Sequence, residues 1–388
     1  MDEVRNPFAP GAGSRPPELA GRDQVVKDAN IAIQRVLAGK AAQSQMLLGL
    51  RGVGKTVLLN KIEEIAAERG HKTSFIEAPE GRRLVDLLYP KIHQVLRQLS
   101  LIQSAKDAAS SALGALRSFA SVFKIHVGDM AFGVEAAQGV ADSGNIEYDL
   151  SDLFLKVGEA AKAAGSAWSL LVDEVQYLEE DELAAVIVAI HRSNQKSLPV
   201  LFFGAGLPQI AALSGDAKSY AERLFIYPPI DALPPPAAKE AVEQPIREEG
   251  ESIEPGALEE IVYKTRGYPY FLQEWAFQAW NTATQSPITS ADVATAAENA
   301  IRRLDDGFFK VRFDRLTPKE REYVVAMAKL GSGPYRSSDV AEVLGEQMTS
   351  LGPRRAQIIA KGMIYSPAHG DIAFTVPMFD EYLKRHWM

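Results

Sequence analysis

Cysteine is absent from the 388 residues of the sequence. Its absence excludes disulfide bonds, thiolate metal sites and a cysteine nucleophile, and it fits the reducing environment of the cytoplasm. Histidine is scarce, with six residues, so few nitrogen ligands exist for a metal. The sequence also lacks a run of about 18 apolar residues and a basic start followed by an apolar core, so neither a membrane span nor a signal peptide is expected.

Basic residues are fewer than acidic ones: 42 Lys and Arg stand against 50 Asp and Glu, which gives a net charge of −8. This balance excludes a protein coated with positive charge for non-specific DNA binding, but it does not exclude a local basic patch. The composition is otherwise that of a globular protein, with 46% hydrophobic and 24% charged residues. A chain of this length can form two or three domains with hydrophobic cores.

An α/β domain is indicated for residues 21–230, where apolar segments and helical segments alternate. The order strand, glycine-rich loop, helix, strand predicts a parallel sheet with right-handed crossovers. The segment at about 101–145 is interpreted as an insertion, with a hairpin at 123–139. The expected strands are 45–48, 72–77, 168–172, 198–204 and 225–227, and the expected helices are 24–37 (capped by Asp23), 57–69, 82–121, 150–164 and 182–193.

Three regions flank this α/β domain. Residues 1–20 are rich in proline and glycine and are expected to form an extended N-terminal arm. A proline-rich break at 228–236 introduces a helical region, which we place at 231–304. Residues 305–388 have a different pattern, with short helices and a terminal hairpin, and are expected to form a third domain.

The clearest motif is Gly-Leu-Arg-Gly-Val-Gly-Lys-Thr at 49–56, which matches the phosphate-loop pattern G-x-x-x-x-G-K-[ST]. Its glycines let backbone N–H groups turn toward phosphate oxygens, and the helix that follows presents its positive end. Lys55 supplies a charge for the outer phosphates, and Thr56 supplies a hydroxyl for Mg²⁺. A simple glycine-rich turn is the alternative, disfavoured by the flanking strand and helix. The predicted nucleotide-binding residues are Gly49, Arg51, Gly52, Val53, Gly54, Lys55, Thr56 and Val57.

An acidic pair, Asp173 and Glu174, follows the apolar strand at 168–172. Asp173 is expected to hold the magnesium ion through water, and Glu174 to polarise the attacking water as a general base. Such a pair is usually only a solvated helix cap, but the phosphate loop upstream favours the catalytic interpretation. The pair predicts an ATPase, which converts ATP and water to ADP and phosphate.

These motifs resemble those of the AAA+ P-loop ATPases, in particular the branch of the origin-recognition replication initiators and the related STAND signalling ATPases. The resemblance also includes Leu-Ala-Gly-Arg-Asp at 19–23, Leu-Phe-Phe-Gly-Ala-Gly-Leu-Pro at 201–208 and Gly-Tyr-Pro-Tyr-Phe-Leu-Gln at 267–273. It implies an AAA+ core, a helical lid and a C-terminal winged helix, with ATP or ADP and Mg²⁺ as ligands. It further implies that Gly21, Arg22 and Pro269 contribute to the nucleotide site.

The chain departs from the family in two places. The strand at 201–206 ends in Gly-Ala-Gly, where many AAA+ enzymes have an Asn, Ser or Thr that orients the attacking water, so slow hydrolysis is implied. The lid carries Gly-Tyr-Pro where initiators have an arginine that reaches the γ-phosphate, and Arg266 is either a substitute or a surface arginine.

Arg223 lies where AAA+ proteins place an arginine finger that acts on the ATP of a neighbouring subunit. A guanidinium there can stabilise the charge of the transferring phosphoryl group. The alternative is an ion pair with Glu222 or another surface carboxylate. A finger implies that the active form is a homo-oligomer or a complex with a partner protein.

The C-terminal region has the pattern of a winged helix-turn-helix. Thr317 and Glu320 form a predicted capping box before a helix at 321–330, and further helices are expected at 339–344 and 354–361. A hairpin is expected from strands 363–366 and 371–375. Residues 310–388 contain 12 Lys and Arg against 9 Asp and Glu. The predicted DNA contacts on the third helix and the hairpin tip are Arg354, Arg355, Gln357, Lys361 and His369.

The sequence therefore predicts an ATP-dependent switch that binds ATP·Mg²⁺ between core and lid, hydrolyses the ATP, and couples nucleotide state to DNA binding or to assembly on DNA. One alternative is a STAND-like regulator, whose winged helix contacts protein and whose nucleotide acts as a slow timer. Another is an ATP-bound scaffold with negligible turnover. Membrane association is not expected.

Overall fold

The computed structural model describes residues 1–11, 19–125 and 135–388. By their internal contacts the residues form two compact units. The first, here called the α/β unit, comprises Arg22–Gly49 and Lys55–Ile230. The second, here called the helical unit, comprises Met1–Gly21, Leu50–Gly54 and Asp231–Met388. Most of the phosphate loop thus belongs to the helical unit by its contacts, although Lys55 belongs to the α/β unit.

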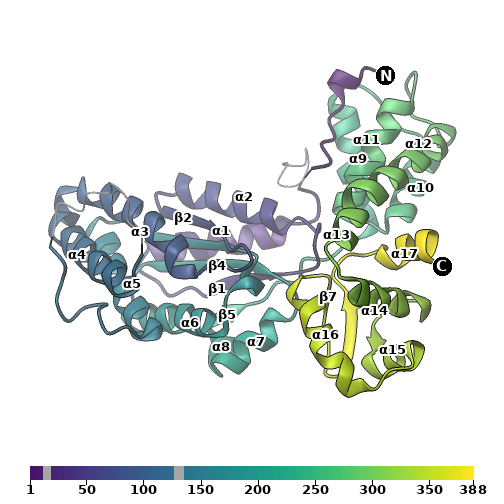
Figure 1. Ribbon diagram of the computed structural model, residues 1–388. Helices are drawn as coiled ribbons and strands as arrows, with labels where there is room; N and C mark the ends of the chain where they lie inside the picture. The colour runs from purple at the N-terminus through teal and green to yellow at the C-terminus, as the bar shows by residue number, and fades with distance from the viewer. Residues whose placement is uncertain (12–18, 126–134) are drawn as a thin grey trace. The chain divides into compact units, whose positions relative to one another are not determined.

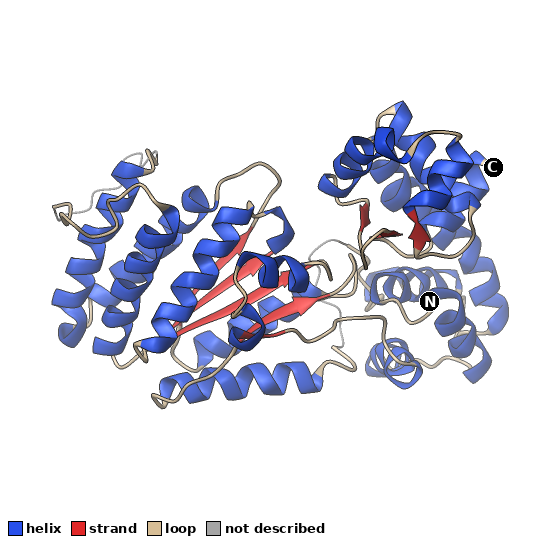
Figure 2. Ribbon diagram, turned by 90° about the horizontal axis from the view of Figure 1, so that it is seen from below, coloured by secondary structure: helices blue, strands red, loops and turns tan. Residues whose placement is uncertain are grey.

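A parallel five-stranded sheet forms the centre of the α/β unit, in the order β2-β3-β4-β1-β5 (Figures 1 and 2). Every residue of β1, β3 and β4 is buried, as expected for apolar strands covered on both faces. The strands are β1 (Ser44–Leu48), β2 (Lys72–Glu77), β3 (Trp168–Asp173), β4 (Val200–Gly206) and β5 (Phe225–Ile226). The predicted α/β fold with a parallel sheet is confirmed.

Helices cover both faces of this sheet. On one face lie α1 (Asp23–Leu37) and α2 (Lys55–Glu68), and on the other lie α5 (Ile146–Ala163) and α6 (Glu180–Gln195) (Figure 1). Two further helices, α3, which precedes the predicted insertion at 101–145, and α4, which lies in it, pack beside α5 and extend the same hydrophobic core. The remaining elements of the unit are α3 (Leu84–Ser100), η2 (Gln103–Ala105), α4 (Lys106–Val122), η3 (Val175–Tyr177), α7 (Ile210–Ala217) and α8 (Ala221–Leu224).

Two expectations for this unit need comment. Asp23 is the first residue of α1 and not its cap, because the carbonyl of Arg22 already accepts the hydrogen bond of Val26 N–H at 3.1 Å. The hairpin predicted at 123–139 falls mainly on residues 126–134, outside the described residues. Its described flanks contain no strand, and Ala137 N–H instead donates to the carbonyl of Gly114 in α4 at 3.1 Å.

Four helices form the first part of the helical unit. Three of them begin with a proline, which the first position of a helix tolerates because its N–H would have no partner there. The N-terminal residues, expected as an extended arm, contact α11: Asn6 Nδ2 donates to the carbonyl of Phe277 at 3.1 Å. The elements are η1 (Glu3–Arg5), α9 (Pro235–Glu248), α10 (Pro255–Thr265), α11 (Pro269–Thr282) and α12 (Ser290–Arg303).

The chain continues from α12 through a π-helical turn into the C-terminal region without a break. That region contains helices and a small antiparallel sheet in the order β6-β8-β7 (Figure 2). Its elements are η4 (Leu304–Phe309), α13 (Lys310–Asp314), α14 (Pro318–Lys329), β6 (Tyr335–Arg336), α15 (Ser337–Leu344), α16 (Met348–Ala360), β7 (Ile364–Tyr365), β8 (Asp371–Phe374) and α17 (Phe379–Trp387). No helix of the described residues is long and apolar enough to cross a membrane.

Two details of the C-terminal region bear on the predictions. The capping box is present: Thr317 and Glu320 each accept a hydrogen bond from the other's backbone N–H. The expected start of the third helix at Arg354 is wrong, since α16 begins at Met348 and contains Pro353. The residue before this proline is Gly352, which lacks the Cβ that would clash with the proline ring in a helix.

Candidate functional site

The phosphate-loop motif lies between β1 and α2, as the sequence predicts. Gly52 and Gly54 have φ values of 85° and 93°, in the region that favours glycine. Lys55 is buried, and its Nζ donates to the carbonyl of Gly49 at 2.9 Å. Gly49 N–H in turn donates to the carbonyl of Gly206 at 3.1 Å. The lysine side chain therefore lies at the carboxyl end of β1, beside the end of β4.

Asp173, the last residue of β3, contacts the residue that follows the lysine. Thr56 Oγ1 donates to Asp173 Oδ2 at 2.5 Å, and the N–H of Glu174 donates to Oδ1 at 2.9 Å. Asp173 is 3% exposed. Burial raises the pKa of its carboxyl, an effect opposed by the Thr56 hydrogen bond and the charge of Lys55. The structure thus brings together the predicted hydroxyl and the predicted carboxylate.

Glu174 adopts a left-handed backbone conformation, with φ of 56°, which is uncommon for a residue other than glycine. Its carboxylate accepts a hydrogen bond from Gln176 Nε2. Gln176 Oε1 accepts a hydrogen bond from Leu207 N–H at 3.2 Å, just after β4. Gln176 therefore connects the candidate general base to the end of a neighbouring strand.

Gln176 belongs to the candidate site and is not among the residues that the sequence predicts for it. A Cβ on Gly206 would lie 3.0 Å from Gln176 Oε1, so the glycine leaves space for this amide. The end of β4 has no side chain that could orient water, but the Gln176 amide lies beside it. The one feature of the sequence that could have indicated this residue is a glutamine two residues after the acidic pair. Whether Gln176 can reach the end of β4 depends on the parallel pairing of β3 with β4, which the sequence alone does not specify.

The donor set of Thr56 and Asp173 fits Mg²⁺. This ion prefers oxygen ligands and commonly binds through one or two protein oxygens together with water and the phosphates of a substrate. Within residues 1–11, 19–125 and 135–388, no group of three or more His, Cys, Asp or Glu side chains could hold a metal on its own. The site therefore suits a metal ion that binds together with phosphates.

The loop residues Leu50–Gly54 contact the rest of the helical unit. Arg51 N–H donates to the carbonyl of Thr375 at 3.2 Å, and Tyr270 N–H donates to the carbonyl of Gly52 at 3.3 Å. A Cβ on Gly52 would lie 3.1 Å from Cε1 of Tyr268. The loop is therefore packed against the start of α11 and the end of β8, and glycine at this position permits the close approach.

The residues assigned by resemblance to the adenine side lie in three places. Gly21 has φ of 68°, and a Cβ there would lie 2.8 Å from the Cβ of Ala237 in α9. Arg22 is 9% exposed and precedes α1. Pro269 is the first residue of α11, between the two tyrosines that contact the loop.

The two predicted phosphate-sensing arginines differ in their surroundings. Arg223 in α8 is exposed, and its guanidinium forms no ion pair with any residue that the structure describes, so the alternative of a pair with Glu222 or another carboxylate is not seen there. Arg266, which ends α10, is 65% exposed and forms an ion pair with Glu381 at 2.5 Å. A carboxylate thus already neutralises Arg266.

Two of the five predicted DNA-contact residues are already paired with carboxylates of the protein. Arg354 forms two 3.0 Å hydrogen bonds with Glu346, and Lys361 Nζ lies 2.6 Å from Glu320 Oε2. Arg355 Nη1 donates to the hydroxyl of Ser337 at 3.0 Å and has no carboxylate partner among the described residues. Gln357 in α16 and His369 in the hairpin turn are exposed.

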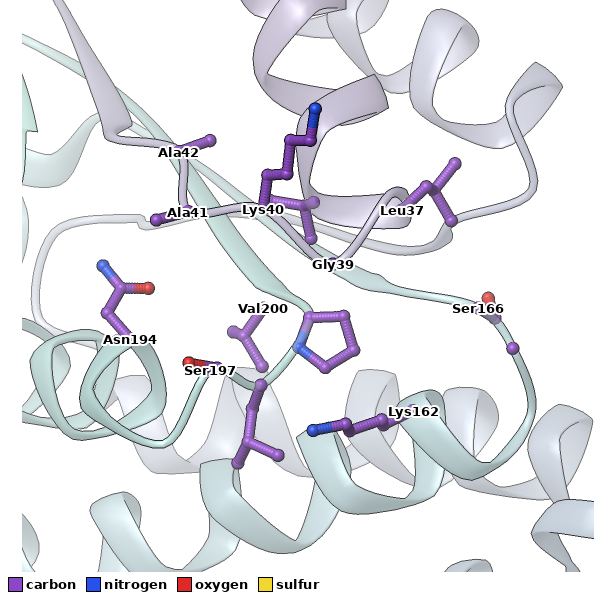
Figure 3. A pocket seen from close by; sticks show the side chains of 14 residues that line it. Leu37, Gly39, Lys40, Ala41, Ala42, Lys162, Ser166, Asn194, Ser197 and Val200 are labelled. Atoms are coloured by element: carbon purple, nitrogen blue, oxygen red, sulfur yellow. The ribbon is translucent and has the colours of Figure 1, made fainter.

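A cavity of about 160 Å³ also lies in the α/β unit (Figure 3). Its lining includes Lys40, Lys162, Ser166 and Asn194. The lining residues precede β1, β3 and β4 or end the adjacent helices, so the cavity lies at the amino ends of the strands. Lys55 and Asp173 lie at the carboxyl ends, and the cavity is therefore not the candidate site.

A parallel sheet with a phosphate loop and an acidic pair at the carboxyl ends of its strands is the arrangement of the P-loop class of α/β folds. In agreement, residues 18–203 match the family described as the AAA ATPase domain. Residues 306–383 match a domain of unknown function, DUF8462. No curated protein matches the chain. The predicted AAA resemblance is confirmed for residues 18–203, whereas the winged helix and the STAND relationship stay predictions.

Solved structures with a similar fold include a Walker-type ATPase of Pyrococcus abyssi, with 16% identity, coverage of 95% of this chain and 97% of that chain, and a TM-score of 0.57. The Orc1 protein of Aeropyrum pernix in complex with DNA has 12% identity, coverage of 98% and 96%, and a TM-score of 0.49. The RuvB Holliday junction branch migration motor of Thermotoga maritima has 16% identity, coverage of 95% and 98%, and a TM-score of 0.46. The first of these likenesses supports the fold of the chain.

The buried carboxylate of Asp173 gives a prediction about stability. Because the pKa of Asp173 is raised in the folded protein, ionisation of its carboxyl lowers the free energy of unfolding. This loss begins near the ordinary pKa of about 4 and grows until the pH passes the raised pKa. Asp173→Asn should therefore raise the free energy of unfolding at pH 7 by on the order of 1 kcal/mol without nucleotide or metal. The difference from the wild type should disappear below about pH 4. Urea unfolding at several pH values measures it.

Asp149 provides the matched control. It is 1% exposed, and its carboxylate accepts hydrogen bonds from Ser143 N, Ser143 Oγ and Gly144 N at 3.0, 2.7 and 2.8 Å. Because an amide cannot accept all three, Asp149→Asn should lower the free energy of unfolding by about 1–3 kcal/mol. A loss of similar size in both variants would contradict the interpretation of Asp173 as a residue that costs stability and serves a ligand.

Proposed function

We propose that the protein binds ATP with Mg²⁺ and hydrolyses it to ADP and phosphate. The observation that carries this proposal is the contact between Thr56 of the phosphate loop and the buried carboxylate of Asp173. Lys55, whose side chain carries the amino group, directly precedes Thr56 in the chain. The hydroxyl and the carboxylate are oxygen ligands for a metal ion, and the ammonium group can contact the phosphates that this ion binds. All three lie at the carboxyl ends of the parallel strands. The match of residues 18–203 to the AAA ATPase domain supports the same function.

Each residue has a proposed role. The N–H groups of Gly52, Val53 and Gly54 and the amino end of α2 bind phosphate oxygens, and Lys55 binds the outer phosphates. Thr56 and Asp173 hold Mg²⁺, which neutralises phosphate charge when it is bound. Gly21, Arg22 and Pro269 contribute to the nucleotide site, as the resemblance implies.

Glu174 acts as the general base in this proposal. It takes a proton from water while the water oxygen forms a bond to the terminal phosphorus, and the bond from that phosphorus to the bridging oxygen breaks to release ADP. Gln176 fixes the orientation of the Glu174 carboxylate through the hydrogen bond between them. Because no side chain at the end of β4 orients the water, we expect turnover to be slow.

Removal of the Lys55 amino group tests nucleotide binding. Lys55→Ala should weaken ATP affinity on the order of 100-fold, since the bound phosphates lose a direct charge contact. Titration with a fluorescent ATP analogue measures the affinity. Lys40→Ala, at the cavity on the amino-end side of the sheet, is the matched control and should bind as the wild type does. Equal binding by Lys55→Ala and wild type would refute the proposed site.

We further propose that the C-terminal region is a winged helix that contacts DNA. Helices α14, α15 and α16 with the β6-β8-β7 sheet support the winged-helix interpretation. Arg355 and Gln357 on α16, together with His369 at the hairpin turn, are the residues available for contacts. The function would then be an ATP-dependent switch that couples nucleotide state to DNA binding or assembly.

A protein contact is the second candidate for this region, as in a STAND-like regulator. The observation in its favour is that Glu346 and Glu320 neutralise Arg354 and Lys361. These ion pairs reduce the positive charge that α16 presents, and backbone phosphates of DNA require such charge.

Salt-dependent DNA binding separates the two candidates. If the region binds DNA, affinity should fall steeply as salt rises, and Arg355→Ala should weaken binding about 10-fold and reduce the salt dependence. Arg354→Ala, in which the paired arginine is removed, is the matched control and should have a smaller effect. Fluorescence anisotropy with duplex DNA measures both. Binding without salt dependence, or no binding, would favour the protein contact.

Arg223 supports an oligomeric active form. Its exposed guanidinium has no ion-pair partner among the described residues, so it is available to a phosphate bound by a neighbouring subunit. We propose this role in trans, with a homo-oligomer or a partner protein supplying the second surface.

A further inference from the structure

The helical unit contains a cavity of about 800 Å³, here called the Trp275 cavity. Its lining comes from α9, α10, α11, α12 and α17, all of which belong to that unit. The described residues that line it include neither the phosphate loop nor Gly21, Arg22 or Pro269. Sites for small organic molecules have volumes of roughly 300–1,000 Å³. The cavity therefore has the size of a ligand site, and its residues are not those of the candidate nucleotide site.

Apolar and aromatic side chains form much of the wall of the Trp275 cavity. Val262 of α10, Trp275 of α11 and Met378, which precedes α17, contribute to it. Tyr263 of α10 also lines the cavity and is 80% exposed. An aromatic ring offers a large contact area to a flat partner. The wall therefore suits a ligand with an aromatic body.

The indole of Trp275 adds a hydrogen-bond donor to this wall. Trp275 is 1% exposed, and its Nε1 has no hydrogen-bond partner among the residues that the structure describes. The other two buried tryptophans do have one: Trp168 Nε1 donates to Ser74 Oγ at 3.0 Å, and Trp280 Nε1 donates to the carbonyl of Asp2 at 2.8 Å. Burial of a donor without an acceptor is unfavourable. A ligand with an acceptor oxygen would remove this cost.

The charged side chains of the Trp275 cavity leave an excess of positive charge. Three of the four cations in the lining are paired with carboxylates: Lys239 with Glu259 at 2.9 Å, Arg266 with Glu381 at 2.5 Å, and Arg385 with Asp305 at 2.5 Å. The fourth is Lys264, in the last turn of α10, which forms no ion pair with any described residue. The ammonium group of Lys264 therefore favours an anionic ligand.

We propose that the Trp275 cavity binds a small organic anion with an aromatic body. The body packs against Tyr263, Val262 and Met378. An acceptor oxygen of the ligand takes the hydrogen bond of Trp275 Nε1, and its acid group lies near Lys264. This site is additional to the proposed ATP site and does not depend on ATP hydrolysis, because the two share no residue.

The test uses 8-anilinonaphthalene-1-sulfonate, an aromatic anion whose fluorescence rises in apolar surroundings. Titration into the intact protein should give saturable binding to one site. Lys264→Ala should weaken binding about three- to fivefold, because an exposed charge contact is lost. The same substitution should leave unchanged the affinity for N-phenyl-1-naphthylamine, which has the same rings without the sulfonate. Tyr263→Ala should weaken the binding of both compounds, because part of the apolar wall is removed.

Trp275→Phe tests the indole donor directly. The substitution removes the N–H and keeps an aromatic ring, and it should weaken sulfonate binding about 10-fold. Circular dichroism shows whether this variant is folded. If it is not, the exposed residues Lys264 and Tyr263 decide the question, since neither substitution removes a buried side chain.

Two substitutions outside the cavity are the matched controls. Lys329 is exposed and lies in the last turn of α14, as Lys264 does in α10. Tyr148 of α5 is 65% exposed. Lys329→Ala and Tyr148→Ala should bind the sulfonate as the wild type does.

Four results would overturn the inference. They are the absence of saturable sulfonate binding, equal losses in Lys264→Ala and Lys329→Ala, an equal loss of both compounds in Lys264→Ala, and displacement of the sulfonate by ATP with Mg²⁺. Displacement would assign the probe to the nucleotide site and leave the proposed function intact.

Discussion

The carboxylate of Asp173 is the constraint on which the candidate site depends. The parallel sheet places the end of β3 beside the end of β4, and β4 beside β1, so Asp173 is buried where α2 begins. Burial of a carboxylate is unfavourable unless hydrogen bonds and charges compensate for lost hydration. Here the Thr56 hydroxyl, the Glu174 N–H and the charge of Lys55 provide partial compensation, and the pKa of Asp173 remains raised. A bound cation would supply the rest, which is why the site has the character of a ligand site.

The phosphate loop adds a second constraint. Its residues Leu50–Gly54 form hydrogen bonds with Tyr270, in α11, and with Thr375, which follows β8. Both ends of the loop are joined covalently to Gly49 and Lys55 of the α/β unit. The loop is therefore fixed by hydrogen bonds to the start of α11 and to the residue after β8 as well as by its chain connections.

Much of the fold was predictable because its signals are local. Apolar strands buried on both faces, a capping box and a glycine-rich loop are each specified by a few adjacent residues. The five strands of the parallel sheet, the Thr317 cap and the loop lie where the sequence predicts them, with shifts of up to two residues at the strand ends. The start of α16 was misplaced because Pro353 normally ends or begins a helix, and the effect of Gly352 before it was overlooked. The hydrogen bond between Thr56 and Asp173 could be expected only because the phosphate loop and the acidic pair together imply a known strand order in the sheet.

The rest of the site depends on contacts between distant residues. Gln176 lies beside the candidate base because its amide contacts both Glu174 and Leu207, which are far apart in the sequence. The ion pairs of Arg354 and Lys361 likewise depend on carboxylates outside α16, Glu346 in the preceding loop and Glu320 in α14. Sequence reasoning identifies charged residues on a helix face, but it cannot tell which of them are already neutralised.

Of the roles proposed for the site, catalysis depends most directly on Glu174 as the base in ATP hydrolysis. The most direct test is phosphate release from ATP by the wild type and by Glu174→Gln with Mg²⁺, at nucleotide concentrations that saturate both proteins. We expect slow but measurable release by the wild type, a decrease of about 100-fold or more in the variant, and ATP that stays bound to the variant. Release at equal rates would contradict the role of Glu174, and no release by the wild type would indicate an ATP-bound scaffold.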